Sequence, residues 1–98
     1  MAADIRLVEP SELRLPPSGH RGADPFKLQR QMAQFGGLMV GMPPPEVYEC
    51  QDGSFMLFNG VTRATRIAKL SPGTKMPVEV IGRIRRRRPD PIIKDFLS

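Results

Sequence analysis

The sequence predicts an α+β fold: a compact domain with a small mixed sheet and two main helices. Short apolar runs bounded by turn-forming residues are typical of strands. Two longer segments carry the start and stop signals of helices. The chain has 98 residues, which suffices for one modest core. We therefore expect one small domain.

The first quarter of the chain predicts a strand followed by a loop. Residues 5–8, IRLV, form a short apolar run, and residues 13–15 have the composition to pair briefly with another strand. The Pro- and Gly-rich residues 16–22 predict a loop, because proline lacks an amide donor and glycine allows positive φ. This loop carries His20, the only histidine of the chain.

A helix is predicted to begin directly after this loop. Asp24 suits an N-cap, and Pro25 suits the first helical position, where its missing N–H costs nothing. Leu28, Met32 and Phe35 follow at the i, i+4, i+7 spacing of one helix face. Two glycines come next, so we expect the helix to end at Phe35.

The second half of the chain predicts a hairpin, a helix and a closing strand. Residues 46–50, EVYEC, and 54–59, SFMLFN, are predicted as two strands around Asp52-Gly53, which is a good hairpin turn signal. Residues 61–70 place apolar and basic residues at helical spacing, and the SPG that follows stops the helix. Residues 76–82, MPVEVIG, alternate as a half-buried strand does.

Charge separates the chain into two parts. The net charge is +5, but residues 1–82 contribute only +1 and residues 83–98 contribute +4. We therefore expect a nearly neutral domain over residues 1–84 and a basic C-terminal arm over residues 85–98. Two prolines favour a loose tail in this arm, although its segment IIKDFL is apolar enough to dock on another surface.

The arginines of this arm are candidate contacts to nucleic acid through counterion release. They are Arg85, Arg86, Arg87 and Arg88. The alternatives are a solubilising tail or an arm that binds an acidic protein partner. No aromatic residue is interleaved with them, so a groove that stacks single-stranded bases is not predicted.

Composition excludes several classes of protein. Cys50 is the only cysteine, so an internal disulfide is impossible and a reducing, cytoplasmic setting is expected. No apolar run approaches the roughly 18 residues of a membrane span. The N-terminus does not have the composition of a secretory signal. No group of His, Cys, Asp and Glu has metal-ligand spacing, so no structural metal is predicted.

The stretch FNGVTRATRI is the main candidate for chemistry. Asn59 and Gly60 permit a tight turn and a close backbone approach, and Thr62 adds a hydroxyl. Arg63 and Arg66 lie three residues apart on one helix face, and guanidinium groups suit bidentate phosphate contacts. A helix N-terminus after glycine also attracts anions. The turn predicts a phosphate site; the alternative for Arg66 and the lysine one turn on is a solvated helix face.

The order and spacing of these segments resemble the ParB/sulfiredoxin superfamily of ParB N-terminal-like domains. The resemblance covers roughly residues 5–84 and rests on DPFKLQRQMAQFG, MPPPEVYECQDGSFMLFNGVTRATRIAKL and MPVEVIG. It implies a phosphate-handling pocket at a Gly-x-x-Arg turn, here Gly60 to Arg63. Members of the superfamily include a peroxiredoxin-repair enzyme that uses ATP, a CTP-binding DNA-partition clamp, and predicted nucleases, some of them in toxin modules.

Individual residues match or depart from the family pattern. Lys27 in DPFKLQ is similar to a lysine that touches nucleotide phosphate in sulfiredoxins, and His20 and Arg21 resemble an arginine-bearing box of partition proteins. Val61 and Thr62 stand where sulfiredoxins carry cysteine and histidine, and where partition proteins carry glutamate and arginine. Repair of a sulfinyl group is therefore not expected, and the residues for CTP hydrolysis are incomplete.

Two functions follow as expectations. The first is binding of a phosphate group from a nucleotide or a nucleic-acid backbone, with phosphodiester or nucleotide hydrolysis as the family-consistent reaction, in a toxin-module or plasmid-associated setting. Arg63 and Thr62 would act on the phosphate, with Glu46 as the best carboxylate for Mg²⁺ and His20 as a candidate general base. The second is a non-catalytic module that binds DNA or protein through the basic arm.

Overall fold

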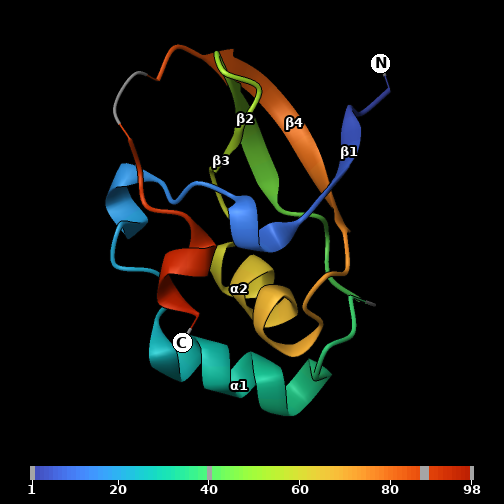
Figure 1. Ribbon diagram of the computed structural model, residues 1–98. Helices are drawn as coiled ribbons and strands as arrows, with labels where there is room; N and C mark the ends of the chain where they lie inside the picture. The colour runs from blue at the N-terminus through green and yellow to red at the C-terminus, as the bar shows by residue number, and fades with distance from the viewer. Residues whose placement is uncertain (1, 40, 87–88, 98) are drawn as a thin grey trace.

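The computed structural model describes residues 2–39, 41–86 and 89–97. Their elements in chain order are β1 (Ile5–Val8), the 3₁₀ turns η1 (Pro10–Glu12) and η2 (Pro17–Gly19), α1 (Pro25–Phe35), β2 (Glu46–Cys50), β3 (Phe55–Leu57), α2 (Val61–Leu70), β4 (Met76–Ile84) and the 3₁₀ turn η3 (Ile93–Phe96). The predicted α+β class is confirmed (Figure 1). Both helices have the bounds that the sequence predicts.

The four strands form one mixed sheet in the order β1-β4-β2-β3. β4 pairs antiparallel with β1 and parallel with β2, and β2 pairs antiparallel with β3. The parallel pair requires a crossover, which β3 and α2 supply. The register of this pair shifts between Val47 and Tyr48, so the sheet is irregular at its centre.

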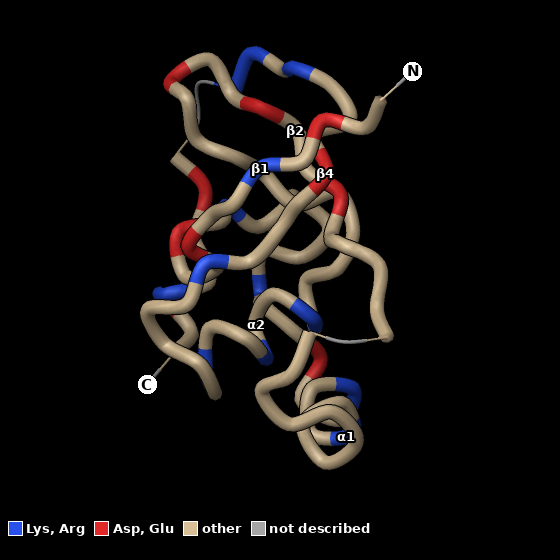
Figure 2. Tube along the Cα trace, turned by 90° about the vertical axis from the view of Figure 1, so that its right-hand side faces the viewer, with Lys and Arg blue, Asp and Glu red and all other residues tan. Residues whose placement is uncertain are grey.

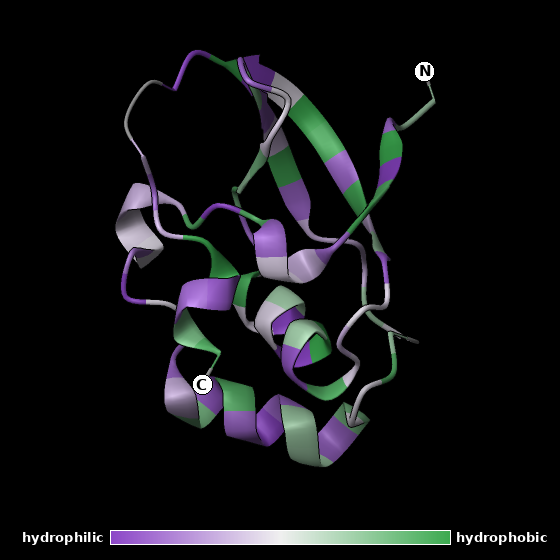
Figure 3. Cartoon of the chain, in the orientation of Figure 1, coloured by the Kyte–Doolittle hydropathy of each residue, from purple (hydrophilic) through white to green (hydrophobic). Residues whose placement is uncertain are grey.

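The core lies between one face of the sheet and α2, and α1 packs on the other side of α2 (Figure 1). Apolar and polar bands alternate along the strands, as expected where one face of a sheet is buried (Figure 3). The buried apolar residues that form the core cluster are Leu13, Leu15, Val47, Leu57, Ala64, Ile67, Ala68, Met76, Val78 and Ile93.

Helix α1 begins as its sequence predicts. The Asp24 side chain accepts hydrogen bonds from the amides of Phe26, at 2.8 Å, and Lys27, at 3.3 Å. Gly36 takes φ of +58° directly after the last helical residue. Because α1 contributes no fully buried residue, it depends on its caps and on its contact with α2.

The C-terminal segment corrects one expectation, because its described part is not a loose tail. The amide of Leu15 donates to the Pro91 carbonyl at 2.8 Å, and the amide of Ile93 donates to the Leu13 carbonyl at 3.0 Å. The Ile93 side chain is 1% exposed and belongs to the core. Proline has no N–H, but its carbonyl still accepts, so Pro91 does not prevent this pairing. Arg87 and Arg88 of the predicted arm lie outside the described residues.

Candidate anion site at the start of helix α2

The turn from β3 into α2 requires a glycine. Gly60 has φ of +88°, a left-handed conformation that other residues rarely adopt. A Cβ atom at this position would lie 2.7 Å from the Cβ atom of Pro45 and 3.1 Å from a guanidinium nitrogen of Arg63. The chain therefore passes close to the proline run here, and the Arg63 side chain folds back over the turn.

The N-terminus of α2 has no side-chain cap among the described residues. Its first intrahelical hydrogen bond runs from the amide of Ala64 to the carbonyl of Gly60, at 2.9 Å. The amides of Val61, Thr62 and Arg63 precede that bond and stand at the positive end of the helix dipole. This end of the helix can therefore receive an anion.

Arg63 is held at this end by two protein contacts. Its guanidinium donates to the Pro43 carbonyl at 2.7 Å and to Asn59 Oδ1 at 3.3 Å. Burial lowers the pKa of Arg63, and the nearby Glu46 carboxylate opposes that shift. These contacts use two of the five N–H donors of a guanidinium, so the side chain is oriented and keeps donors for a ligand.

Glu46 lies in the same group. The Asn59 side-chain amide donates to Glu46 Oε1, and the backbone amide of Glu46 donates to Asn59 Oδ1 at 3.1 Å. The structure thus gathers four of the predicted site residues, Glu46, Asn59, Gly60 and Arg63, around one turn. The Glu46 carboxylate reduces the positive potential at the start of α2. A phosphate bound to a cation such as Mg²⁺ is therefore repelled less at this turn than a phosphate without a cation.

Arg66 corrects both sequence interpretations, because it is neither solvated nor free for a phosphate. Its side chain is 1% exposed, and one guanidinium nitrogen donates to the carbonyls of Gly36, at 2.7 Å, and Leu38, at 2.6 Å. The guanidinium also lies 5.3 Å from the centre of the Phe35 ring. Arg66 therefore caps the C-terminal end of α1. Lys69, one turn further on, is exposed as expected.

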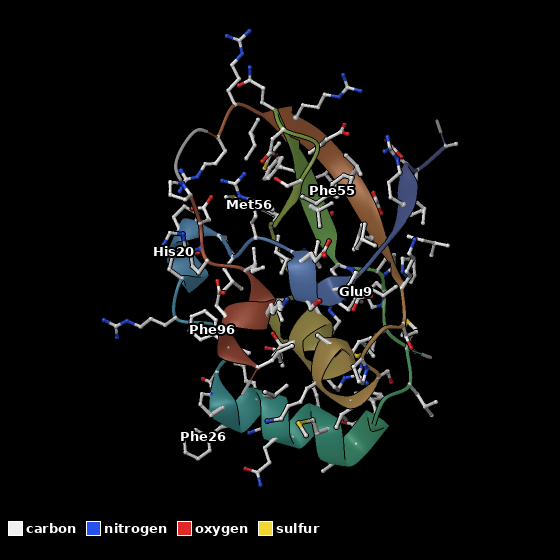
Figure 4. The ribbon with its side chains drawn as sticks, viewed as in Figure 1. Glu9, His20, Phe26, Phe55, Met56 and Phe96 are labelled. Atoms are coloured by element: carbon white, nitrogen blue, oxygen red, sulfur yellow. The ribbon has the colours of Figure 1, made fainter. Side chains whose placement is uncertain are left out.

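His20 belongs to a different cluster. Its Nε2 lies 3.0 Å from Oδ1 of Asp90, and Arg14 and Arg86 each place a guanidinium nitrogen 2.8 Å from the same carboxylate. His20 lies beside the C-terminal segment in Figure 4. Within the described residues, no hydrogen bond or ion pair joins it to Arg63. A role for His20 as general base at the α2 turn therefore has no contact to support it.

Sequence reasoning missed the centre of this second cluster. The Asp90 side chain is fully buried, and hydrogen bonds from Arg86, Arg14 and His20 hold its pKa well below the usual range. Asp90 lies between two prolines in a basic segment, which is a pattern of a loose tail. The only available signal was that it is one of two acidic residues among the basic ones.

The remaining candidates lie at the surface. Lys27 and Arg21 are exposed, and no hydrogen bond or ion pair within the described part of the chain links either side chain to the start of α2. Arg85 is also exposed, whereas Arg86 is paired with Asp90. Among the described residues, Lys and Arg positions occur on α1, on α2, on β1 and at the end of the sheet away from the helices (Figure 2).

A small apolar pocket adjoins the turn. Its volume is about 50 Å³, and Arg63 and Arg66 form its polar wall. The rest of its lining is Met39, Met42, Pro43, Pro44, Pro45, Ile67, Met76 and Pro77. The pocket has room for a few water molecules or for one small apolar group.

Two further findings concern the described residues as a whole. They contain no group of three or more His, Cys, Asp and Glu side chains that could hold a metal ion. Neither α1 nor α2 has the length and apolar character to cross a bilayer.

Comparison of the chain with protein-family models, with curated proteins and with solved structures finds no match.

Proposed function

We propose that this chain binds a phosphate group, carried by a nucleotide or by a nucleic-acid backbone, at the start of α2. One observation carries the proposal: the helix opens without a side-chain cap, and Arg63 is fixed over its first turn with donors to spare. Backbone amides at a helix start and a guanidinium are the two groups that proteins use most readily for phosphate. Thr62 adds a half-buried hydroxyl on the same turn.

The resemblance to the ParB/sulfiredoxin superfamily supports the same turn. Gly60 and Arg63 are the residues of the Gly-x-x-Arg element, and both have definite roles in the local geometry. We propose membership of that superfamily on this basis. Cys50 is buried and unpaired, which suits the reducing cytoplasm that we propose as its location.

Hydrolysis of a phosphodiester or nucleotide is the reaction class that agrees with this proposal. Arg63 and the helix amides would stabilise charge on the phosphate. Glu46 is the carboxylate of the site, and one carboxylate together with phosphate oxygens is a common way to hold Mg²⁺. Binding is the primary proposal, because the described site contains no activated nucleophile.

A second candidate is a non-catalytic module that binds DNA or a protein partner through the basic segment. Arg83 favours it, because its side chain is 83% exposed near the end of β4, close in sequence to the exposed Arg85, although it lies 3.3 Å from the Glu49 carboxylate. The pairing of Arg86 with Asp90 removes one cation from that surface.

Calorimetric titration with ATP, CTP, GTP, inorganic phosphate and short duplex DNA, each with and without Mg²⁺, tests both candidates. Arg63→Lys keeps the charge but loses the planar fork, and we expect at least about tenfold weaker nucleotide binding. Lys69→Ala, on the exposed side of α2, is the matched control and should leave binding unchanged.

The same titration of Arg85→Gln distinguishes the basic segment from the turn. DNA binding that Arg85→Gln weakens and Arg63→Lys leaves intact would overturn the phosphate site and favour the second candidate. Deletion of residues 85–98 is unsuitable for this purpose, because it removes Ile93 from the core and Asp90 from its cluster.

A further inference from the structure

Strand β1 leaves one edge of the sheet open. It is the end strand in the order β1-β4-β2-β3, and its other side has no strand partner among the described residues (Figure 1). The opposite end of the sheet is closed, because Arg14 bridges to Met56 beyond β3. An open edge presents unpaired N–H and C=O groups that can accept another strand.

The backbone N–H and C=O groups of β1 face β4 and the open edge at alternate residues, so one known hydrogen bond to β4 identifies the residues that face the open edge. The Asp4 carbonyl accepts from the amide of Val80 at 2.8 Å, so Asp4 turns its backbone groups towards β4. In an antiparallel ladder this direction alternates along the strand. The N–H and C=O groups of Ile5 and Leu7 therefore point away from β4, to the open edge, and those of Ala3 follow the same parity.

The side chains at this edge are unusually apolar for an exposed strand. Leu7 is 66% exposed and Ile5 is 46% exposed, and they lie opposite Pro77 and Glu79 of β4 on one face of the sheet. Natural edges are usually protected by proline, lysine or a bulge. Residues 3–7 carry no proline, lysine or bulge, and their only protections are the shortness of β1 and two charged side chains. Those two, Asp4 and Arg6, pair with each other within one copy at 2.8 Å, and in the register described below they pair between copies.

The sequence of this edge is complementary to itself. When ADIRL pairs antiparallel with a second copy about Ile5, Asp4 stands opposite Arg6 of the second copy, and Arg6 stands opposite its Asp4. Ile5 then meets Ile5, and Leu7 meets Ala3. In the same register, the outward backbone groups of Ala3, Ile5 and Leu7 exchange hydrogen bonds. The two charge pairs then fall at non-hydrogen-bonded positions, where side chains are closest.

One register, the antiparallel pairing centred on Ile5, satisfies the outward backbone groups, pairs the opposite charges and covers the exposed apolar side chains. Shifting the partner by two residues removes at least one of the charge pairs, and shifting it by one residue places the outward backbone groups out of phase. We propose that β1 is a homodimer interface, in which two copies pair antiparallel through residues 3–7 and join their sheets into one. This interface is separate from the proposed phosphate site, and either can fail without the other.

Sedimentation velocity on the full chain from micromolar to millimolar concentration tests this proposal. We expect the wild-type mass to rise with concentration towards twice that of the monomer. Arg6→Asp places two acidic pairs across the interface, and Asp4→Arg places two basic pairs, so each variant alone should remain monomeric. A mixture of the two variants restores both charge pairs and should form a heterodimer. The double variant Asp4→Arg/Arg6→Asp should dimerise as the wild type does.

Circular dichroism establishes that each variant is folded, and Arg30→Asp on the exposed side of α1 serves as a charge-matched control that should dimerise normally. A wild type that stays monomeric at every concentration would overturn the proposal. So would single variants that dimerise as strongly as the wild type, because the copies would then meet through another surface.

Discussion

At the scale of single residues, two arginines three positions apart on α2 have different roles. Arg63 lies over the first turn of its own helix and keeps donors for a ligand. Arg66 is directed to the carbonyls that end α1, where it neutralises the negative end of that helix. Only the first of them is available to bind an anion.

Replacing Arg66 with methionine tests its structural role. The stem of the side chain is kept, but the carbonyls of Gly36 and Leu38 lose the buried guanidinium that donates to them. We expect the free energy of unfolding to fall by about 2–4 kcal/mol, as measured by urea titration. Lys69→Met removes an exposed cation from the same helix and should change it by less than about 0.5 kcal/mol. Equal effects of the two substitutions would show that Arg66 does not cap α1.

The direction of Arg66 could not be predicted from the sequence. Its spacing from Arg63 places both on one helix face, but the spacing does not tell whether solvent or another element covers that face. The covering element is α1, which precedes it by more than thirty residues and packs there through tertiary contacts. The sequence placed Asn59 and Arg63 in one turn and singled out Glu46 as a carboxylate, but it contained no local signal for the hydrogen bonds that join Glu46 to Asn59, 13 residues away.

At the scale of elements, local signals predicted the bounds of both helices, whereas the strands predicted at residues 54–59 and 76–82 are Phe55–Leu57 and Met76–Ile84. Asp24 and Pro25 define the start of α1, and Gly60 defines the start of α2, because caps and positive φ are properties of a few adjacent residues. The pairing of the strands and the return of the C-terminal segment to Leu13 and Leu15 depend on distant partners. A single sequence contains no local signal for them.

The turn into α2 allows a controlled test of steric fit. Gly60 and Gly53 share φ of +88°, but a Cβ atom at Gly53 would meet nothing within 4 Å. Gly53→Ala therefore measures the cost of the left-handed backbone alone, about 1–2 kcal/mol. Gly60→Ala adds the contact with Pro45 and should cost about 1–3 kcal/mol more in thermal or urea unfolding. Equal costs would contradict the close approach of the proline run.

At the scale of the whole molecule, the two ends of the chain stabilise each other. Arg14 forms bridges to both Met56 and Ile92, so the segment near the start of the chain lies between β3 and the C-terminal segment. The ion pair of Arg14 with Asp90 spans 76 residues, and the contact of His20 with Asp90 spans 70. Such long-range contacts explain why the C-terminal residues cannot be separated as an arm.

The Asp90 cluster predicts a specific dependence of stability on pH. Its partners are Arg86, Arg14 and His20, and they hold its pKa below the ordinary value of 3.8. A carboxyl group whose pKa is lower in the folded state contributes stability that is complete above its unfolded pKa and is lost as the pH falls towards the folded pKa. The contribution of Asp90 is therefore present at neutral pH and declines below about pH 4.

Asp90→Asn measures this contribution directly. At about pH 7 we expect the variant to lose about 3–5 kcal/mol, because the buried guanidinium of Arg14 loses its nearer carboxylate and keeps the more distant Asp52, at 3.8 Å. The difference in free energy of unfolding between wild type and variant should narrow as the pH falls to about 3, because the Asp90 carboxyl then binds a proton in the unfolded wild type while it stays ionised in the folded protein. Asp24→Asn, an exposed N-cap in which asparagine also caps well, should keep the wild-type pH profile. If this difference in free energy of unfolding stays constant between about pH 7 and about pH 3, Asp90 stabilises the fold through packing, and its ion pairs with Arg14 and Arg86 contribute nothing measurable.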